Sequence, residues 1–218
     1  MFQNLDLAEL ILKLPAILFG LAIHEFSHAL TATKLGDDTP ERQGRLTLNP
    51  VAHIDPIGFL MLLVAGFGWA KPVQIDPRAF KKSRRDEILV SIAGPISNIL
   101  AAVFFVFLLK LMLSVDLSWI QIENFQPYFA RMLFYFIIIN VVLAVFNMLP
   151  IPPLDGSHLI SVFIPGRYAG FKEGLLRYGS MIFILIIIAE NITQINFFPI
   201  AEVTIVITDF LFRIFGIN

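Results

Sequence analysis

Five stretches of this sequence are long and apolar enough to cross a lipid bilayer as helices. They cover residues 5–35, 88–113, 128–149, 174–189 and 197–215, and the fourth reaches the ~20 residues that a span requires if it begins near Ala169. Inside a bilayer every backbone N–H and C=O must be satisfied within the protein, which an α-helix achieves by itself. Hydrophobic residues make up 57% of the chain and charged residues only 15%. We therefore predict an all-α polytopic membrane protein with about five to six transmembrane helices.

A shorter apolar run follows the first of these stretches. Residues 57–70 contain three glycines and lie between Pro56 and Pro72. Its ~14 residues are too few for a helix that crosses ~30 Å of hydrocarbon, and irregular backbone at membrane depth needs protein or a watery cavity around it. We expect a short re-entrant or β-hairpin element after the first helix, with a kinked helix pair as the alternative.

The basic residues predict the orientation of the chain, because cytoplasmic loops carry an excess of Lys and Arg. Thirteen of the sixteen basic residues fall in one set of loops and tails, whereas loops 116–126 and 190–196 contain none. The thirteen are Lys34, Arg42, Arg45, Lys71, Arg78, Lys81, Lys82, Arg84, Arg85, Arg167, Lys172, Arg177 and Arg213. We therefore expect an integral protein of the cell's inner or plasma membrane, with the N-terminus outside and the C-terminus in the cytosol.

Residues 24–28 read His-Glu-Phe-Ser-His within an otherwise apolar stretch. Ionisable side chains at membrane depth are costly and mark functional sites. On a helix His24 and His28 share a face, so both imidazoles can bind one metal ion. In an H-E-x-x-H motif the intervening carboxylate acts on a water molecule, which makes Glu25 the candidate base. The structural alternative is a pair of core histidines that are hydrogen-bonded across helices.

The motif lies below the membrane surface. His24 precedes Lys34 by ten residues, which at ~1.5 Å per residue is roughly 15 Å. The chain has no cysteine, so any further metal ligand must be a His, Asp, Glu or Asn side chain.

A catalytic zinc commonly has three protein ligands, and Asp155 is the best candidate for the third. It lies in the sequence NMLPIPPLDG, whose three prolines must end or break the third span. Such a break is tolerated at membrane depth where it lines a cavity, which would place a carboxylate near a watery site. Asp155 could equally be the N-cap of a helix that starts at Ser157.

Asparagines inside the second and third spans are further candidates. Asn98 and Asn147 could each donate a hydrogen bond to a substrate carbonyl or to a developing oxyanion. Each could also bridge helices, as membrane asparagines often do, and bridging is the role expected of Asn140.

The remaining histidines, His53 and His158, could be ligands in a differently built site, but a hydrogen bond to backbone is the more ordinary role.

Two classes of function fit these residues. The first is a zinc-dependent endopeptidase in which Glu25 activates the attacking water. The alternative is an intramembrane protein that binds or transports a divalent metal without protease activity, since His and Asp also build ion paths. A transporter gains nothing specific from a glutamate between two ligands, and no inverted repeat is visible. The net charge of −1 gives no indication of a nucleic-acid partner.

Several segments together resemble the site-2 protease family of intramembrane zinc metalloproteases. They are HEFSH in the first span, AGPISN in the second and NMLPIPPLDG at the end of the third, joined by RLTLNPVAHIDPIG and GFGWAKPV between them. The resemblance covers about residues 20–160 in the order of the family, and this joint occurrence is far more specific than H-E-x-x-H alone.

The resemblance implies roles for individual residues. His24, His28 and Asp155 correspond to the ligands of one Zn²⁺ per chain, and Glu25 corresponds to the catalytic base. Asn147 matches a residue that holds substrate near the zinc, and Asn98 matches the asparagine of the G-P-x-x-N segment. The implied substrate is a membrane-spanning helix of another protein, cut within the lipid bilayer in regulated intramembrane proteolysis.

The resemblance also implies a minimal member of the family. We expect residues 1–218 to form a single membrane-embedded protease domain, with a core over about 5–160 and extra C-terminal helices over about 170–216. The loop between the second and third spans leaves no room for a PDZ domain, and the C-terminal end leaves none for a CBS pair.

Overall fold

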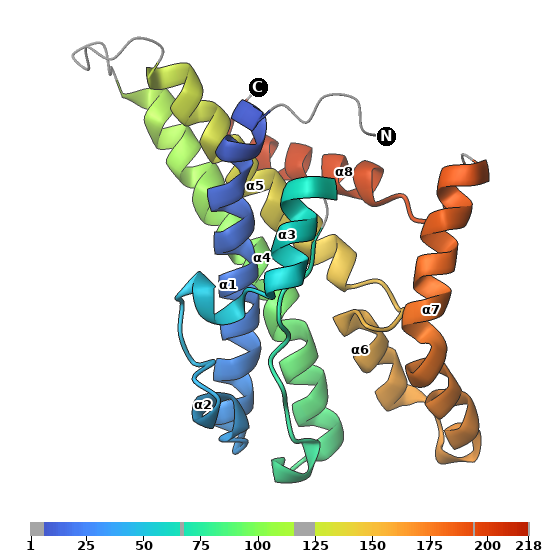
Figure 1. The fold of residues 1–218 in the computed structure, drawn as a ribbon. Helices are drawn as coiled ribbons and strands as arrows, with labels where there is room; N and C mark the ends of the chain where they lie inside the picture. Colours follow the sequence, from blue (N-terminus) through green and yellow to red (C-terminus); the bar gives the residue numbers. More distant parts are fainter. Residues whose placement is uncertain (1–6, 66–67, 116–124, 194, 218) are drawn as a thin grey trace.

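The computed structural model describes residues 7–65, 68–115, 125–193 and 195–217. Within these ranges the regular structure is helical, and no β-strand is present (Figure 1). The α-helices are α1 (Leu7–Leu35), α2 (Thr39–Arg42), α3 (Pro56–Ala65), α4 (Ser83–Ser114), α5 (Phe125–Asn147), α6 (Asp155–Phe163), α7 (Ala169–Thr193) and α8 (Ile200–Ile214). The prediction of an all-α protein is confirmed for the described part of the chain.

Helices α1, α4 and α5 pack together as the centre of the molecule. Their core is a cluster of buried apolar side chains, to which α8 adds Leu211 where it crosses α5. Phe19 of α1 joins this core edge-on, with its ring centroid 5.3 Å from that of Phe105 and 5.6 Å from that of Phe136. Three helices held along their length in this way give a rigid frame for side chains near their middle.

The outer surface of the bundle is apolar. On α4, for example, Leu100 is 64% exposed, Phe104 53% and Phe107 51%. Such a surface suits lipid rather than water, because monomeric soluble proteins rarely expose contiguous apolar patches of this extent. By length and composition, Glu9–Leu35, Ser83–Ser114 and Pro127–Asn147 can cross a membrane. The chain is thus an integral membrane protein.

The predicted number of five to six spans is only partly matched. Helix α8 has 15 residues, about 22 Å at 1.5 Å per residue, which is less than the ~30 Å of a bilayer's hydrocarbon. Helix α7 runs over 25 residues and stands apart from α1, α4 and α5 in Figure 1. Most of the loop predicted to lie outside, residues 116–124, falls outside the described residues.

The connection from α1 to α4 is anchored by a buried carboxylate. Asp37 is fully buried, and its two oxygens accept hydrogen bonds from the backbone N–H groups of Thr39 and Asp76.

An isolated antiparallel bridge joins Ile54 to Ala70 around α3. Where a re-entrant or hairpin element is predicted, the described residues form a ten-residue helix and a single bridge, which do not confirm that element. Residues 66–67 are outside the described ranges.

Candidate metal centre

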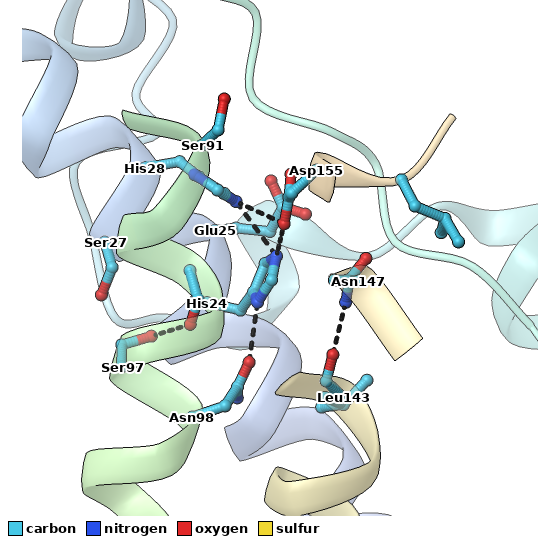
Figure 2. Close-up of polar contacts among 12 residues, drawn as sticks. His24, Glu25, Ser27, His28, Ser91, Ser97, Asn98, Leu143, Asn147 and Asp155 are labelled. Atoms are coloured by element: carbon cyan, nitrogen blue, oxygen red, sulfur yellow. Dashed lines mark hydrogen bonds and ion pairs between the residues drawn. The ribbon is translucent and has the colours of Figure 1, made fainter. Parts of the chain in front are cut away.

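Two histidines of α1 face each other in the interior. His24 and His28 are 4% and 6% exposed, and their Nε2 atoms lie 3.0 Å apart. The residues are four apart in a helix of 29 residues, so the helical repeat places both rings on one face. That face is turned toward α4 and the start of α6 (Figure 2).

The third polar group comes from the break after α5. Helix α5 ends at Asn147, the proline-rich turn follows, and α6 begins at Asp155. Oδ2 of Asp155 lies 3.0 Å from His24 Nε2 and 3.3 Å from His28 Nε2. Asp155 is the first residue of α6, and the residue at the N-cap position is Leu154. The alternative in which Asp155 caps a helix starting at Ser157 therefore does not describe this turn.

A glycine allows the turn to fold back in this way. A Cβ atom added to Gly156 would lie 2.5 Å from the carbonyl oxygen of Leu149. Real Cβ atoms do not approach backbone that closely, so a larger residue would push α6 away from the end of α5. Gly156 thus lets the chain bring Asp155 up to the two histidines.

The remaining ring nitrogens of the histidines are held by carbonyl oxygens. His24 Nδ1 lies 2.7 Å from Asn98 Oδ1, and His28 Nδ1 lies 2.7 Å from the backbone oxygen of Val90. Both partners are acceptors, so each Nδ1 donates a proton to its partner, and Nε2 is the ring nitrogen left to face a metal ion. Such partners of the second nitrogen fix the orientation of metal-ligating histidines.

The orientation of the Asn98 amide follows from its other contacts. Its Nδ2 donates to the backbone oxygen of Gly20 and to Asn140 Oδ1, each at 2.9 Å. Asn140 is fixed in turn, because its own Nδ2 donates to the backbone oxygen of Phe136. The amide oxygen of Asn98 therefore points to His24, and Asn98 joins α1, α4 and α5.

These residues fit a zinc ion. The Nε2 atoms of the two imidazoles and one carboxylate oxygen lie 3.0–3.3 Å from one another, close enough to bind one cation together. A tetrahedral zinc with ligand distances of about 2.0–2.1 Å separates its ligand atoms by roughly 3.3 Å. Asp155 Oδ2 is buried, and its contacts with the two imidazole nitrogens are its polar contacts among the described residues, as expected of an atom that shares a metal with them.

A glycine of α4 faces the same atoms. A Cβ atom at Gly94 would lie 2.6 Å from His24 Nε2 and in closer contact still with His28 Nε2. The missing side chain leaves open the space beside both ligand atoms. Gly94 thus lets α4 pack closely on α1 without filling the space beside the two Nε2 atoms.

Glu25 is beside the three ligands (Figure 2). It is 9% exposed, and its Oε2 accepts a hydrogen bond of 2.9 Å from the backbone N–H of Val73. Glu25, both histidines and Asp155 line one open cavity of about 310 Å³. A water molecule or a peptide segment in this cavity can therefore contact the carboxylate and the ligands together.

Of the other candidate residues, some line the cavity and others lie away from it. Asn147 lines the cavity, and its Nδ2 donates to the backbone oxygen of Leu143. Asn98 is fully buried and lies outside the cavity lining. His158 lines the cavity without joining the three ligands, and His53 bonds through Nε2 to the backbone oxygen of Thr47 in the α1–α4 connection.

Three parts of the site were not foreseen from the sequence. Val73 and Val90 contribute backbone groups, which no pattern of side chains reveals. Gly94 precedes Pro95, a pair that suggests a kink or close helix packing rather than a glycine facing a metal position.

Comparison with known proteins adds an independent line of information. A sequence model of peptidase family M50 matches residues 112–189. YwhC of Bacillus subtilis, designated a candidate zinc metalloprotease, is 41% identical over 172 residues, which cover 79% of this chain and 78% of YwhC.

Two further relatives carry the same designation. MJ0611 of Methanocaldococcus jannaschii is 30% identical over 160 residues, 73% of this chain and 74% of the relative. Rip2 of Mycolicibacterium smegmatis is 28% identical over 188 residues, 84% of this chain and 69% of the relative. No solved structure gives a significant match.

Proposed function

The chain belongs to peptidase family M50, the site-2 protease family, and we propose that this zinc metalloendopeptidase cleaves a membrane-spanning helix of another protein inside the bilayer. The observation that supports the proposal best is the convergence of His24, His28 and Asp155 beside Glu25 in one cavity. The cavity is formed by helices whose outer faces are apolar, so a substrate that reaches it from the membrane is itself a membrane protein.

The ligand set assigned to the zinc is His24, His28 and Asp155. Bound zinc supplies a Lewis acid that polarises a carbonyl and lowers the pKa of water toward ~7. The Glu25 carboxylate takes a proton from the attacking water and delivers it to the leaving amide nitrogen. Asn98 is a positioning residue, because it reaches the reaction only through the ring of His24.

The substrate must lose helical structure before it is cut. The carbonyl groups of a transmembrane helix are already hydrogen-bonded to N–H groups of the same helix. Cleavage therefore requires a locally unwound segment in the cavity, where Asn147 is placed to bind its backbone. This is the chemistry of regulated intramembrane proteolysis.

The whole chain contributes one protease domain, residues 1–218, with the site in the part that ends near residue 160. Its cytosolic side carries the basic loops, so the N-terminus lies outside and the C-terminus in the cytosol of a cell's inner or plasma membrane. Cysteines introduced singly test this orientation cleanly, because the chain has none of its own.

The test of the function is Glu25→Gln, assayed for zinc content and for cleavage of a panel of membrane helices. Glutamine keeps the shape but cannot accept the proton, so zinc should stay bound while cleavage falls at least ~10²-fold. Glu87→Gln is the matched control, since Glu87 lines the same cavity but accepts a hydrogen bond from Ser83. Transport of a divalent metal by both forms, with cleavage by neither, would support the metal-transport alternative instead.

A further inference from the structure

A second cavity lies where α1 ends and α4 begins. Its volume is about 240 Å³, slightly below the ~300–1,000 Å³ of sites for drug-sized ligands. Four of its lining side chains are cationic: Lys34 from the last turn of α1, Lys81 and Lys82 just before α4, and Arg85 from its first turn. These two helix ends lie together at the bottom of Figure 1.

The positive charge of this cavity is only partly offset by the protein, because four cations and one carboxylate line it. Of the ion pairs between described residues, none involves these four side chains. The one acid in the lining, Asp86, is buried and accepts a hydrogen bond from the backbone N–H of Lys82. The C-terminal end of α1 carries a partial negative charge and the N-terminal end of α4 a partial positive charge, and the two offset each other. The four cationic side chains therefore determine the sign of the electrostatic potential in the cavity.

Other basic residues of the same loops behave differently. Arg42 pairs with Asp38 and Arg78 pairs with Asp76, each at 2.8 Å. The hydrogen bonds from Arg78 hold the pKa of the Asp76 carboxyl below its usual range. Four cations without an ion pair among the described residues therefore lie together at this cavity, where a bound anion would relieve their mutual repulsion.

The position of the cavity at the ends of two membrane-spanning helices, together with its lining, indicates an amphiphilic ligand. Lys34 and Leu35 close a helix that can span the membrane, and α4 begins another. Leu35 lines the cavity and also packs on a small apolar cluster of Ala32, Phe80 and Val90. The site thus combines four cationic side chains with the aliphatic side chain of Leu35 at the membrane boundary. We propose that it binds the phosphate group of an anionic phospholipid headgroup.

A lipid headgroup and free phosphate share the same anionic chemistry, so the experiment must separate them. The zinc-loaded protein is purified in neutral detergent and titrated with dioleoyl phosphatidylglycerol, with phosphatidylcholine and with inorganic phosphate, and bound lipid is counted by native mass spectrometry. Wild-type protein should retain phosphatidylglycerol in preference to phosphatidylcholine. A large excess of inorganic phosphate should not displace it.

The variant Lys34→Gln/Arg85→Gln removes two of the four cations. Each basic residue near an anionic lipid surface contributes about a factor of five in affinity, so phosphatidylglycerol binding should fall about 25-fold. Arg42→Gln/Arg78→Gln changes the net charge equally outside the cavity and should bind within twofold of wild type. Lys34→Arg/Arg85→Lys keeps the charge and should also bind normally.

Three results would overturn the lipid site. Equal losses in the two Gln variants would mean that net charge alone attracts the lipid. Displacement of phosphatidylglycerol by inorganic phosphate would make this a site for the free anion. Loss of binding in the charge-conserving variant, with zinc content and melting temperature unchanged, would show that the cationic charge is not what holds the lipid.

Discussion

Replacing Asn98 by alanine tests whether the orientation of a ligand ring sets zinc affinity. The substitution removes the acceptor of His24 Nδ1–H and both bonds that the Asn98 amide donates. Losing such a partner typically weakens metal binding 10–100-fold, about 1.4–2.7 kcal/mol. The tautomer and angle of the His24 ring would no longer be fixed, although every ligand would still be present.

Asn140→Ala is the matched control. Asn140 is equally buried, and the substitution removes its bonds to Asn98 and to the backbone of Phe136 while leaving the contact with His24 in place. At ~0.6 kcal/mol for a hydrogen bond between membrane helices, Asn98→Ala, which removes three such contacts, should cost about 2 kcal/mol of stability, and Asn140→Ala, which removes one, about 0.6 kcal/mol. Both variants thus lose contacts between helices, whereas only Asn98→Ala should lower the zinc affinity by at least tenfold.

The assay is zinc competition against a chromogenic chelator, together with thermal melting of the same zinc-loaded samples. Zinc affinity should fall in Asn98→Ala, which loses the contact to His24, and stay within about threefold of wild type in Asn140→Ala, which keeps it. If both variants lose the same affinity, Asn98 acts only by joining helices. If Asn98→Ala keeps wild-type affinity, the histidine ring is oriented by something else.

Other changes to the site and the chain give further predictions. Asp155→Ala should lose bound zinc, measured by elemental analysis, because two ligands remain of three; full occupancy would remove Asp155 from the ligand set. Gly94→Ala should also lower zinc content, since its Cβ would meet the ligand nitrogens, whereas Gly174→Ala on α7 meets no atom within 4 Å and should leave it unchanged. Chelation should abolish cleavage, and added zinc should restore it. A cysteine at position 83 should react with a membrane-impermeant reagent only from the cytosolic side, and labelling from outside would reverse the topology.

Each residue of the proposed ligand set has a local signal in the sequence, and the structure brings the three side chains together. His24 and His28 share a helical face by spacing alone, and the prolines before Asp155 require a break in the helix that carries them. The long apolar stretches likewise predict α1, α4 and α5. These features depend on short-range geometry, which residue order determines directly.

The role of Asn98 could not be decided in the same way. An asparagine in a membrane helix can bind substrate or join helices, and the choice depends on how α4 is rotated against α1. That rotation is determined by packing between residues far apart in the chain, such as Phe19 and Phe105. The C-terminal helices were also less predictable, since α8 is apolar enough to be read as a span but is only 15 residues long.

The hydrogen bond from Val73 to Glu25 limits how the chain can vary in evolution. The donor is a main-chain N–H, which nineteen of the twenty amino acids supply equally, so the identity of residue 73 is nearly free. The register is not free, because the segment is fixed on one side by Lys71 N–H to the carbonyl of His53 and on the other by Asp76 N–H to Asp37. One inserted or deleted residue between these two anchors would replace the donor facing the carboxylate. Natural variants of this segment should therefore differ in composition while keeping its length.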